Sequence, residues 1–320
     1  MNRRECLALL GAITALAPSA LAQQPTTMRR LGVLTVTEDD VIGQAPLAEA
    51  LAAHGWKETA NLQIDWRSGD GDRQRTAKFA EELVALKPDV LFAIGTPSVE
   101  ELQKRTAAPI VFAVITDPVS QGFVKNLAHP GGNITGFTDY DGPLAGKWLD
   151  LLTQIQPRMS RVFVVYNPAT APFAGLMLHT IEQAGRTLYV TVEPAPVHDA
   201  ASLAALASHR DGGFLVLPDF FTMANRAPLL AAIAQARAPA MFWSRIFVDE
   251  GGLMAYSTDS AEQLRRAASY IDRILRGAQA ADLPVQNPTK FELAINLKTA
   301  KAIGVTLPPS LLATANDVIE

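Results

Sequence analysis

The chain has 320 residues, of which 48% are hydrophobic and 19% are charged, with a formal net charge of −4 and one cysteine. This composition excludes a disordered chain, and the charge balance disfavours a nucleic-acid binder, which carries a basic stripe. A single cysteine excludes a disulfide framework and a metal site built from several cysteines.

The first residues have the pattern of a secretory signal peptide. Arg3 and Arg4 precede a twelve-residue apolar run at 6–17, and Ala20 and Ala22 form an A-x-A cleavage site. The run is too short to cross the roughly 30 Å hydrocarbon core of a membrane as a helix, which argues against an anchor. We therefore predict a signal peptide over 1–22, cleaved after Ala22, and a periplasmic mature chain. Export by the Sec or the twin-arginine route stays open.

In the next part of the chain, short apolar runs alternate with amphipathic segments. The apolar runs predict strands at 31–36, 61–67, 89–95, 109–114 and 133–138. The segments between them predict helices at 44–54, 72–86, 97–106 and 118–127. The β-branched residues and regular spacing of the apolar runs favour strands over short buried helices.

The alternation of apolar runs and amphipathic segments begins again after residue 138. Helices are predicted at 143–156, 171–184, 199–208, 222–236 and 259–276. Strands are predicted at 161–166, 187–192, 213–218, 239–243 and 252–257. Alternating strands and helices indicate βαβ units and parallel sheets, and ten or more strands are too many for one compact sheet. The prediction is an α/β protein with two doubly wound parallel-sheet lobes.

The sequence carries no recognisable catalytic or metal-binding pattern. The five histidines include no H-E-x-x-H, and neither a G-x-S-x-G elbow nor a P-loop is present. We expect no enzymatic activity, no metal and no cofactor.

Polar and aromatic residues instead follow the predicted strands, where parallel α/β sheets bind ligands. In the first half these candidate ligand-binding residues are Thr37, Thr96, Ser98, Thr116 and Asp117. In the second half they are Asn167, Asp219, Phe220, Trp243 and Tyr256. Thr96, Ser98 or Asp117 could equally cap the helix that follows, and the aromatic side chains could belong to the core.

Several segments resemble a known family. DVLFAIGTPSV at 89–99, the block at 108–138, GGLMAYSTD at 251–259 and above all the block at 281–320 are similar to substrate-binding proteins of bacterial ABC importers, in the group with tryptophan- and aromatic-amino-acid-type binding proteins. Two positions depart from many members: Thr37-Glu38-Asp39-Asp40 replaces a glycine- and serine-rich turn, and Ser257 replaces a glycine. Ligand identity therefore cannot be copied from a relative.

The resemblance implies a type-I periplasmic-binding fold, in which three crossovers form a hinge between the lobes. The N-terminal lobe would be 28–137 plus 258–286, and the C-terminal lobe 138–257 plus 287–320. We predict a monomeric solute-binding component that takes up an aromatic amino acid or aromatic carboxylate by hinge closure and delivers it to a membrane permease and ATPase. In that hypothesis Thr96, Ser98 and Thr116 receive the carboxylate, Asp219 or Asp117 an ammonium, and the aromatic side chains the ring. The alternative is a periplasmic sensor that presents its ligand to a membrane receptor.

Overall fold

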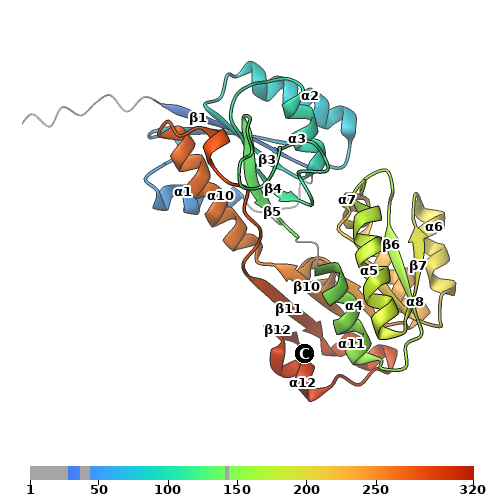
Figure 1. Ribbon diagram of the computed structural model, residues 1–320. Coiled ribbons are helices and arrows are strands. Elements are labelled where there is room, and N and C mark those ends of the chain that lie inside the picture. Colours follow the sequence, from blue (N-terminus) through green and yellow to red (C-terminus); the bar gives the residue numbers. More distant parts are fainter. Residues whose placement is uncertain (1–27, 37–43, 141–143) are drawn as a thin grey trace, which may run out of the picture.

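The fold is taken from a computed structural model that describes residues 28–36, 44–140 and 144–320. The chain forms two lobes, each built on its own sheet (Figure 1). The predicted signal peptide and Thr37 lie outside the described residues.

The first lobe contains a five-stranded, fully parallel sheet. Its strand order is β2 (Leu62–Ser68), β1 (Arg29–Thr35), β3 (Val90–Ile94), β4 (Ile110–Ile115) and β5 (Ile134–Thr138). One face packs against α1 (Gln44–Ala53) and α10 (Ser260–Leu275), and the other against α2 (Arg73–Ala85) and α3 (Thr96–Gln103). Both faces are covered, which explains why β3 is a continuous apolar run with every residue buried.

The second lobe contains a seven-stranded sheet. Its order is β12 (Asp317–Ile319), β11 (Phe291–Asn296), β10 (Met254–Thr258), β9 (Ala240–Phe242), β8 (Gly213–Val216), β6 (Arg161–Tyr166) and β7 (Thr191–Pro196). The helices of this lobe are α4 (Leu144–Ile155), α5 (Ala174–Leu188), α6 (Ala200–Ala205), α7 (Phe220–Ala224), α8 (Arg226–Ala236), α9 (Arg245–Asp249), α11 (Leu297–Ile303) and α12 (Pro309–Thr314). Short 3₁₀ turns follow α6 at Leu206–Ser208 and α10 at Ala280–Asp282.

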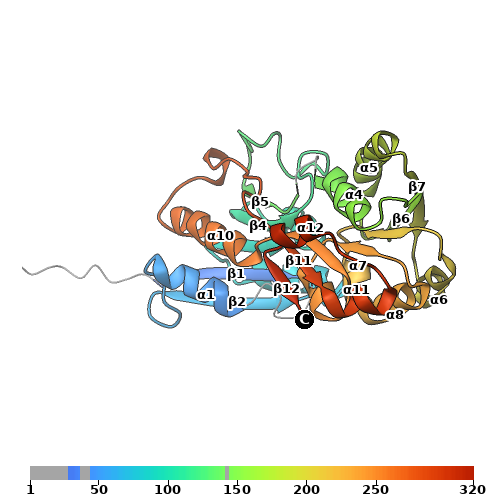
Figure 2. The ribbon, with the colours of Figure 1, turned by 90° about the horizontal axis from the view of Figure 1, so that it is seen from below.

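The chain passes between the two sheets three times: after β5, after β10 and before β11. Helix α10 follows a strand of the second sheet but packs on the first, beside α1, which the view of Figure 2 also shows. The predicted α/β class with two parallel-sheet lobes is confirmed. One pair departs from it, because β11 runs antiparallel to β10.

Three predicted elements differ from the structure. Residues 118–127 form turns rather than a helix, since Gly122 lies in the left-handed region and closes a turn onto Val119. The strand predicted at 187–192 begins only at Thr191, because α5 continues to Leu188 and ends on Tyr189 in the left-handed region. The helix predicted at 222–236 is divided at Asn225 into α7 and α8.

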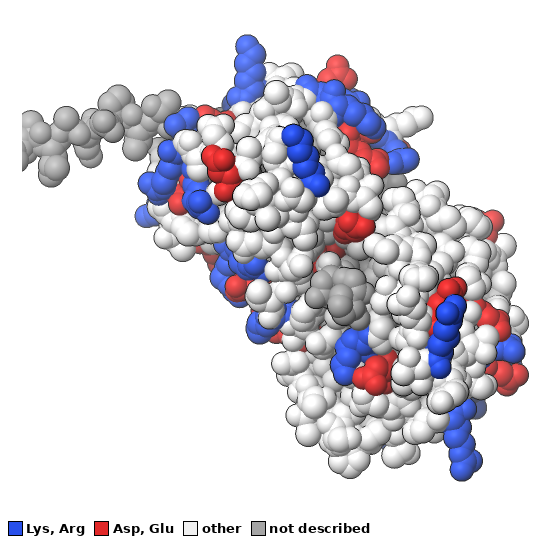
Figure 3. All heavy atoms as spheres, in the orientation of Figure 1, with Lys and Arg blue, Asp and Glu red and all other residues white. Residues whose placement is uncertain are grey.

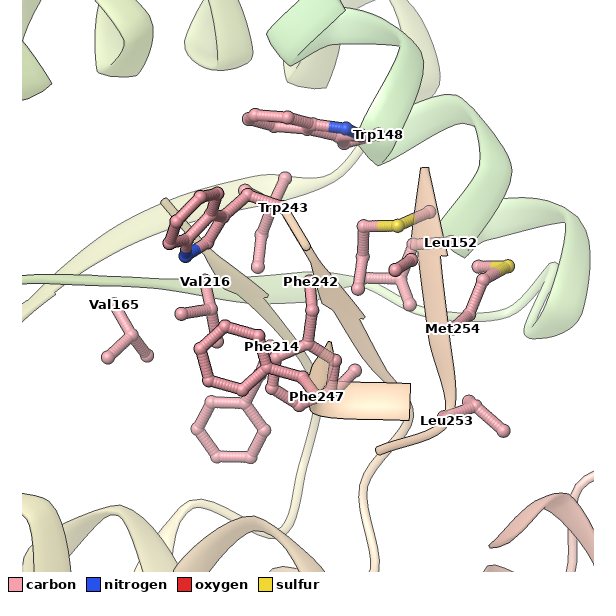
Figure 4. Packing of buried hydrophobic residues seen from close by; sticks show 14 of the residues in the cluster. Trp148, Leu152, Val165, Phe214, Val216, Phe242, Trp243, Phe247, Leu253 and Met254 are labelled. Atoms are coloured by element: carbon pink, nitrogen blue, oxygen red, sulfur yellow. The ribbon is translucent and has the colours of Figure 1, made fainter. Parts of the chain in front are cut away.

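The core of the second lobe is centred on aromatic side chains, several of which Figure 4 shows. Trp148 on α4 is fully buried and donates from Nε1 to the backbone carbonyl of Tyr256 at 2.8 Å. Its ring also meets Tyr140 edge-on, with centroids 5.2 Å apart. Trp148 therefore fixes α4 to the end of β10, close to two of the crossings.

The substitution Trp148→Phe tests this anchor. We expect it to cost about 1–2 kcal/mol, because the buried carbonyl loses its indole donor while most of the apolar contact remains. Thermal unfolding should show a melting temperature lower by a few degrees. Tyr189→Phe, at a side chain that is 92% exposed, should leave it unchanged. Equal melting temperatures for both variants would contradict this role of Trp148.

Candidate functional site

A small pocket lies between the lobes, at the carboxyl ends of strands from both sheets. The first lobe contributes Thr96, Val114 and Thr116. Asp139 comes from the crossing after β5, and the second lobe contributes Thr170, Phe173, Pro218, Asp219, Phe220 and Trp243. Parallel sheets place ligands at this end of their strands, so the pocket has the position of a binding site.

A distortion of β4 shapes the floor of the pocket. The register between β4 and β5 shifts between Phe112 and Ile115, and Val114 within this bulge has φ 58°. A β-branched residue rarely adopts the left-handed region, and such strain concentrates at functional sites. Because of the bulge, Val114 and Thr116 both reach the pocket, and the Asp139 N–H meets the carbonyl of Ile115 at 3.3 Å.

Asp139 is a buried carboxylate, only 4% exposed. Its Oδ1 accepts a hydrogen bond from the Thr116 hydroxyl at 3.0 Å. Burial raises the pKa of Asp139 from 3.8 to about 7, although the bonds from Thr116 and from the backbone N–H groups of Asp139 and Tyr140 oppose the rise. Burial, with the charge of Asp139, also raises the pKa of Tyr140 well above its usual value.

Asp219 is also buried, but hydrogen bonds engage both of its carboxylate oxygens. Oδ2 accepts from the Asn167 N–H at 2.8 Å, and Oδ1 accepts from the Phe221 N–H at 2.9 Å and from the Thr170 hydroxyl. Asp219 thus caps α7 and holds the loop after β6. Burial raises its pKa above the usual range, and these bonds counteract part of the rise.

Two aromatic side chains of the second lobe face the first. Phe220 lies so close to Gly95 that a Cβ atom there would stand 2.5 Å from the Phe220 Cζ. Trp243 is 8% exposed and packs beside Phe247, with ring centroids 6.1 Å apart (Figure 4). The Trp243 Nε1 is buried and has no hydrogen-bond acceptor in the described part of the protein.

The structure brings five of the ten predicted residues together in this pocket: Thr96, Thr116, Asp219, Phe220 and Trp243. Asp117 lines a neighbouring pocket, which shares Thr116 and reaches Leu176 on α5. Asn167 supports Asp219 through its backbone, and Ser98 is fully buried without lining either pocket. Tyr256 stacks on Phe291 away from both, with centroids 5.5 Å apart.

Sequence reasoning missed half of the described lining residues: Val114, Asp139, Thr170, Phe173 and Pro218. Four of these follow a strand of one of the two sheets, so the rule that found Thr116 also applies to them. Asp139 comes directly after Thr138, the last residue of β5. Val114 had no such signal, because it lies inside a strand and reaches the pocket only through the bulge.

Outside the pocket, charges of both signs are spread over the two lobes on the face shown in Figure 3. Among the described residues, no helix has the length and apolar character needed to span a membrane. Within the same ranges, no group of three or more histidine, cysteine, aspartate or glutamate side chains is placed to hold a metal ion.

A family model described as ABC transporter substrate binding protein matches residues 33–319. The chain belongs to this family. The resemblance found in the sequence is thereby confirmed, and the family is one of substrate-binding proteins rather than enzymes. Such proteins bind small molecules and serve ABC transporters, which include a permease and an ATPase.

Individual relatives agree with this assignment. The chain is 27% identical over 284 residues to a tyrosine-binding protein of Clostridioides difficile strain R20291, which covers 86% of this chain and 81% of that protein. A conserved domain protein from Vibrio cholerae matches with TM-score 0.85 and 27% identity, over 91% of this chain and all of that one. An ABC domain from Streptococcus pneumonia in complex with L-Trp matches with TM-score 0.84 and 26% identity, over 92% and 100%.

We predict that the buried Asp139 makes the stability of the natural protein depend on pH in a way that the stability of Asp139→Asn does not. Its pKa is 3.8 in the unfolded chain and about 7 in the fold, so between these values the folded chain holds an extra proton. The free energy of unfolding therefore falls as pH rises through this interval. Asp139→Asn removes that loss, and ligand-free variant protein should melt several degrees above the natural protein at pH 8 but at the same temperature at pH 4. The facing groups Asp219 and Tyr140 are present in both proteins, so a difference independent of pH would contradict the assignment.

Proposed function

We propose that this protein is the extracytoplasmic solute-binding component of an ABC importer and that it captures an aromatic amino acid between its lobes. The observation that carries the proposal is the pocket between the two sheets, where Phe220 and Trp243 of one lobe face Thr96 and Thr116 of the other. Aromatic faces hold a flat ring, and hydroxyl and backbone N–H groups hold a carboxylate.

Capture would follow from rotation of the lobes about the three crossings, which is a common mode of domain closure. In this proposal the lobes have the bounds predicted from the sequence, 28–137 plus 258–286 and 138–257 plus 287–320. Hydrogen bonds link the crossings to one another: Thr138 Oγ1 donates to Asn287 Oδ1 at 2.9 Å, and Gln263 Nε2 donates to the Thr138 carbonyl at 3.2 Å. A hinge held in this way can bend while the two sheets stay rigid.

The ligand class rests on the pocket and on the relatives. Thr96 begins α3, where the helix dipole favours an anion, and its hydroxyl makes no hydrogen bond within the described ranges. Phe220, Trp243 and the additional Phe173 supply aromatic surface for a ring. A protein named for tyrosine binding and a structure holding L-Trp are both similar to this chain, which favours aromatic amino acids.

The cellular setting follows from the N-terminal pattern. We propose that residues 1–22 direct export, that cleavage occurs after Ala22, and that the monomeric mature protein works in the periplasm. It would deliver its ligand to a permease and an ATPase and carry out no reaction itself.

The ligand can be identified by calorimetry and thermal shift on the mature protein, residues 23–320, refolded to remove any carried ligand. L-Tyrosine, L-tryptophan or L-phenylalanine should bind and raise the melting temperature, because a ligand at 100 times its dissociation constant adds about 2.7 kcal/mol to the free energy of unfolding. Binding of sugars, nucleosides or aliphatic amino acids only would refute the aromatic ligand while leaving the family role intact.

Closure itself can be tested at Gly95. In this structure a Cβ at Gly95 would stand 2.5 Å from the Phe220 Cζ of the other lobe, so Gly95→Ala should hold the lobes apart, and ligand-induced compaction measured by small-angle X-ray scattering should be lost. Gly122→Ala is the matched control, since Gly122 also has positive φ but has no atom within 4 Å of a Cβ. The double variant Gly95→Ala/Phe220→Ala should regain compaction. Unchanged compaction in Gly95→Ala would count against closure onto this contact.

A further inference from the structure

The charge of the pocket restricts the ligand it can take. Among the described residues, its lining includes two carboxylates, Asp139 and Asp219, and no lysine, arginine or histidine. A ligand that brings only a carboxylate would therefore place its negative charge near two acids with no cationic side chain to compensate. A ligand that also brings a cation would meet the opposite charge that buried acids require.

The two acids are not equivalent as partners for a cation. Asp219 accepts three hydrogen bonds from the protein, through the Asn167 N–H, the Thr170 hydroxyl and the Phe221 N–H. Those bonds fix the loop after β6 and the start of α7. Asp139 accepts one bond from another side chain, that of Thr116, beside those from the nearby backbone N–H groups of Asp139 and Tyr140, and no ion pair joins it to a described lysine, arginine or histidine.

The location of Asp139 also allows its carboxylate to contact a polar group of a ligand in the pocket. It lies on the crossing directly after β5, between the lobes, so it faces the pocket from the hinge side and not from either wall. Thr96 and α3 stand on one wall, and Phe220 and Trp243 stand on the other. An α-amino acid has the matching arrangement, with its ammonium, carboxylate and ring on three sides of one carbon.

We propose that Asp139 receives the ammonium group of the ligand and so restricts the site to primary amines, excluding aromatic carboxylates that lack one. This inference rests on the proposed function and refines it, and it assigns to Asp139 the role that the sequence suggested for Asp219 or Asp117. An ammonium donating to Asp139 would form a charge-assisted hydrogen bond, the stronger kind in a buried site. Asp219 keeps a positioning role through the loop that carries Thr170.

The test compares ligand pairs that differ only in the amine, by calorimetry on the natural mature protein at pH 8. The pairs are L-tryptophan and indole-3-propionate, L-tyrosine and 3-(4-hydroxyphenyl)propionate, and L-leucine and 4-methylpentanoate. We expect the aromatic acids to bind roughly a hundredfold more weakly than the matching amino acids, because a buried charge loses its partner. Asp139→Asn should lower the affinity for the amino acids by a similar factor, and it should not lower the affinity for the acids, because it removes one of the two negative charges near their carboxylate.

The control is Glu182→Gln on α5, which removes one negative charge away from this pocket and should leave every affinity unchanged. The pairs also separate the two proposals. If the aromatic acids bind as well as the amino acids, or if Asp139→Asn keeps the preference for amines, the ammonium site is refuted and the aromatic ligand survives. If only leucine binds, the aromatic ligand is refuted and the ammonium site survives. If no compound binds, both are refuted.

Discussion

The hydrogen bonds around Thr138 are the constraint on which the arrangement of both lobes depends. Its N–H donates to the Gln286 carbonyl at 3.0 Å, its hydroxyl donates to Asn287, and its carbonyl accepts from Gln263 of α10. The crossing after β10 thus supplies one partner and the crossing before β11 supplies two, while Thr138 itself stands where the first crossing begins. These bonds lie at the end of β5, where Gln286 pairs with the strand, so they would keep the crossings together during a movement of the lobes.

The same segment connects the hinge to the pocket. Asp139 follows Thr138 directly, and the Tyr140 hydroxyl donates to the Trp243 carbonyl at 2.9 Å. Tyr140 also contacts Trp148, which holds the end of β10. A ligand that engages Asp139 and Trp243 would therefore contact residues beside the crossings. Under the proposed function, binding and closure would be coupled through adjacent residues of the chain, and no distant relay would be needed.

Apolar runs predicted the two sheets well, because strands covered on both faces must be apolar along their whole length. They could not predict the direction of β11, which depends on where the third crossing returns after α10 has packed on the first lobe. Apolar runs also could not predict the conformation of 118–127 or the residue at which α5 ends. There the left-handed conformations of Gly122 and Tyr189 end or replace the expected element.

The pocket was predictable to the extent that it lies at strand ends. Thr96, Thr116, Asp219, Phe220 and Trp243 were found by that rule. Asp139 satisfies it too, but it lies at the junction between the lobes, where the sequence indicated a boundary and not a binding position. Which of the acids stays available to a ligand could not be read from the sequence. That distinction depends on hydrogen bonds between residues about 50 positions apart, such as those from Asn167 and Thr170 to Asp219.

A buried carboxylate without a cationic partner lowers the stability of the ligand-free protein at neutral pH, as the raised pKa of Asp139 indicates. Such a residue persists in a fold where the free-energy cost of its buried charge is relieved in a functional state. A cationic ligand group would relieve it, since an opposite charge favours the ionised carboxylate. The free energy recovered by Asp139 on binding would then add to the affinity for amines. It would add nothing for a neutral or anionic ligand, so one residue would set both the instability of the empty pocket and its selectivity.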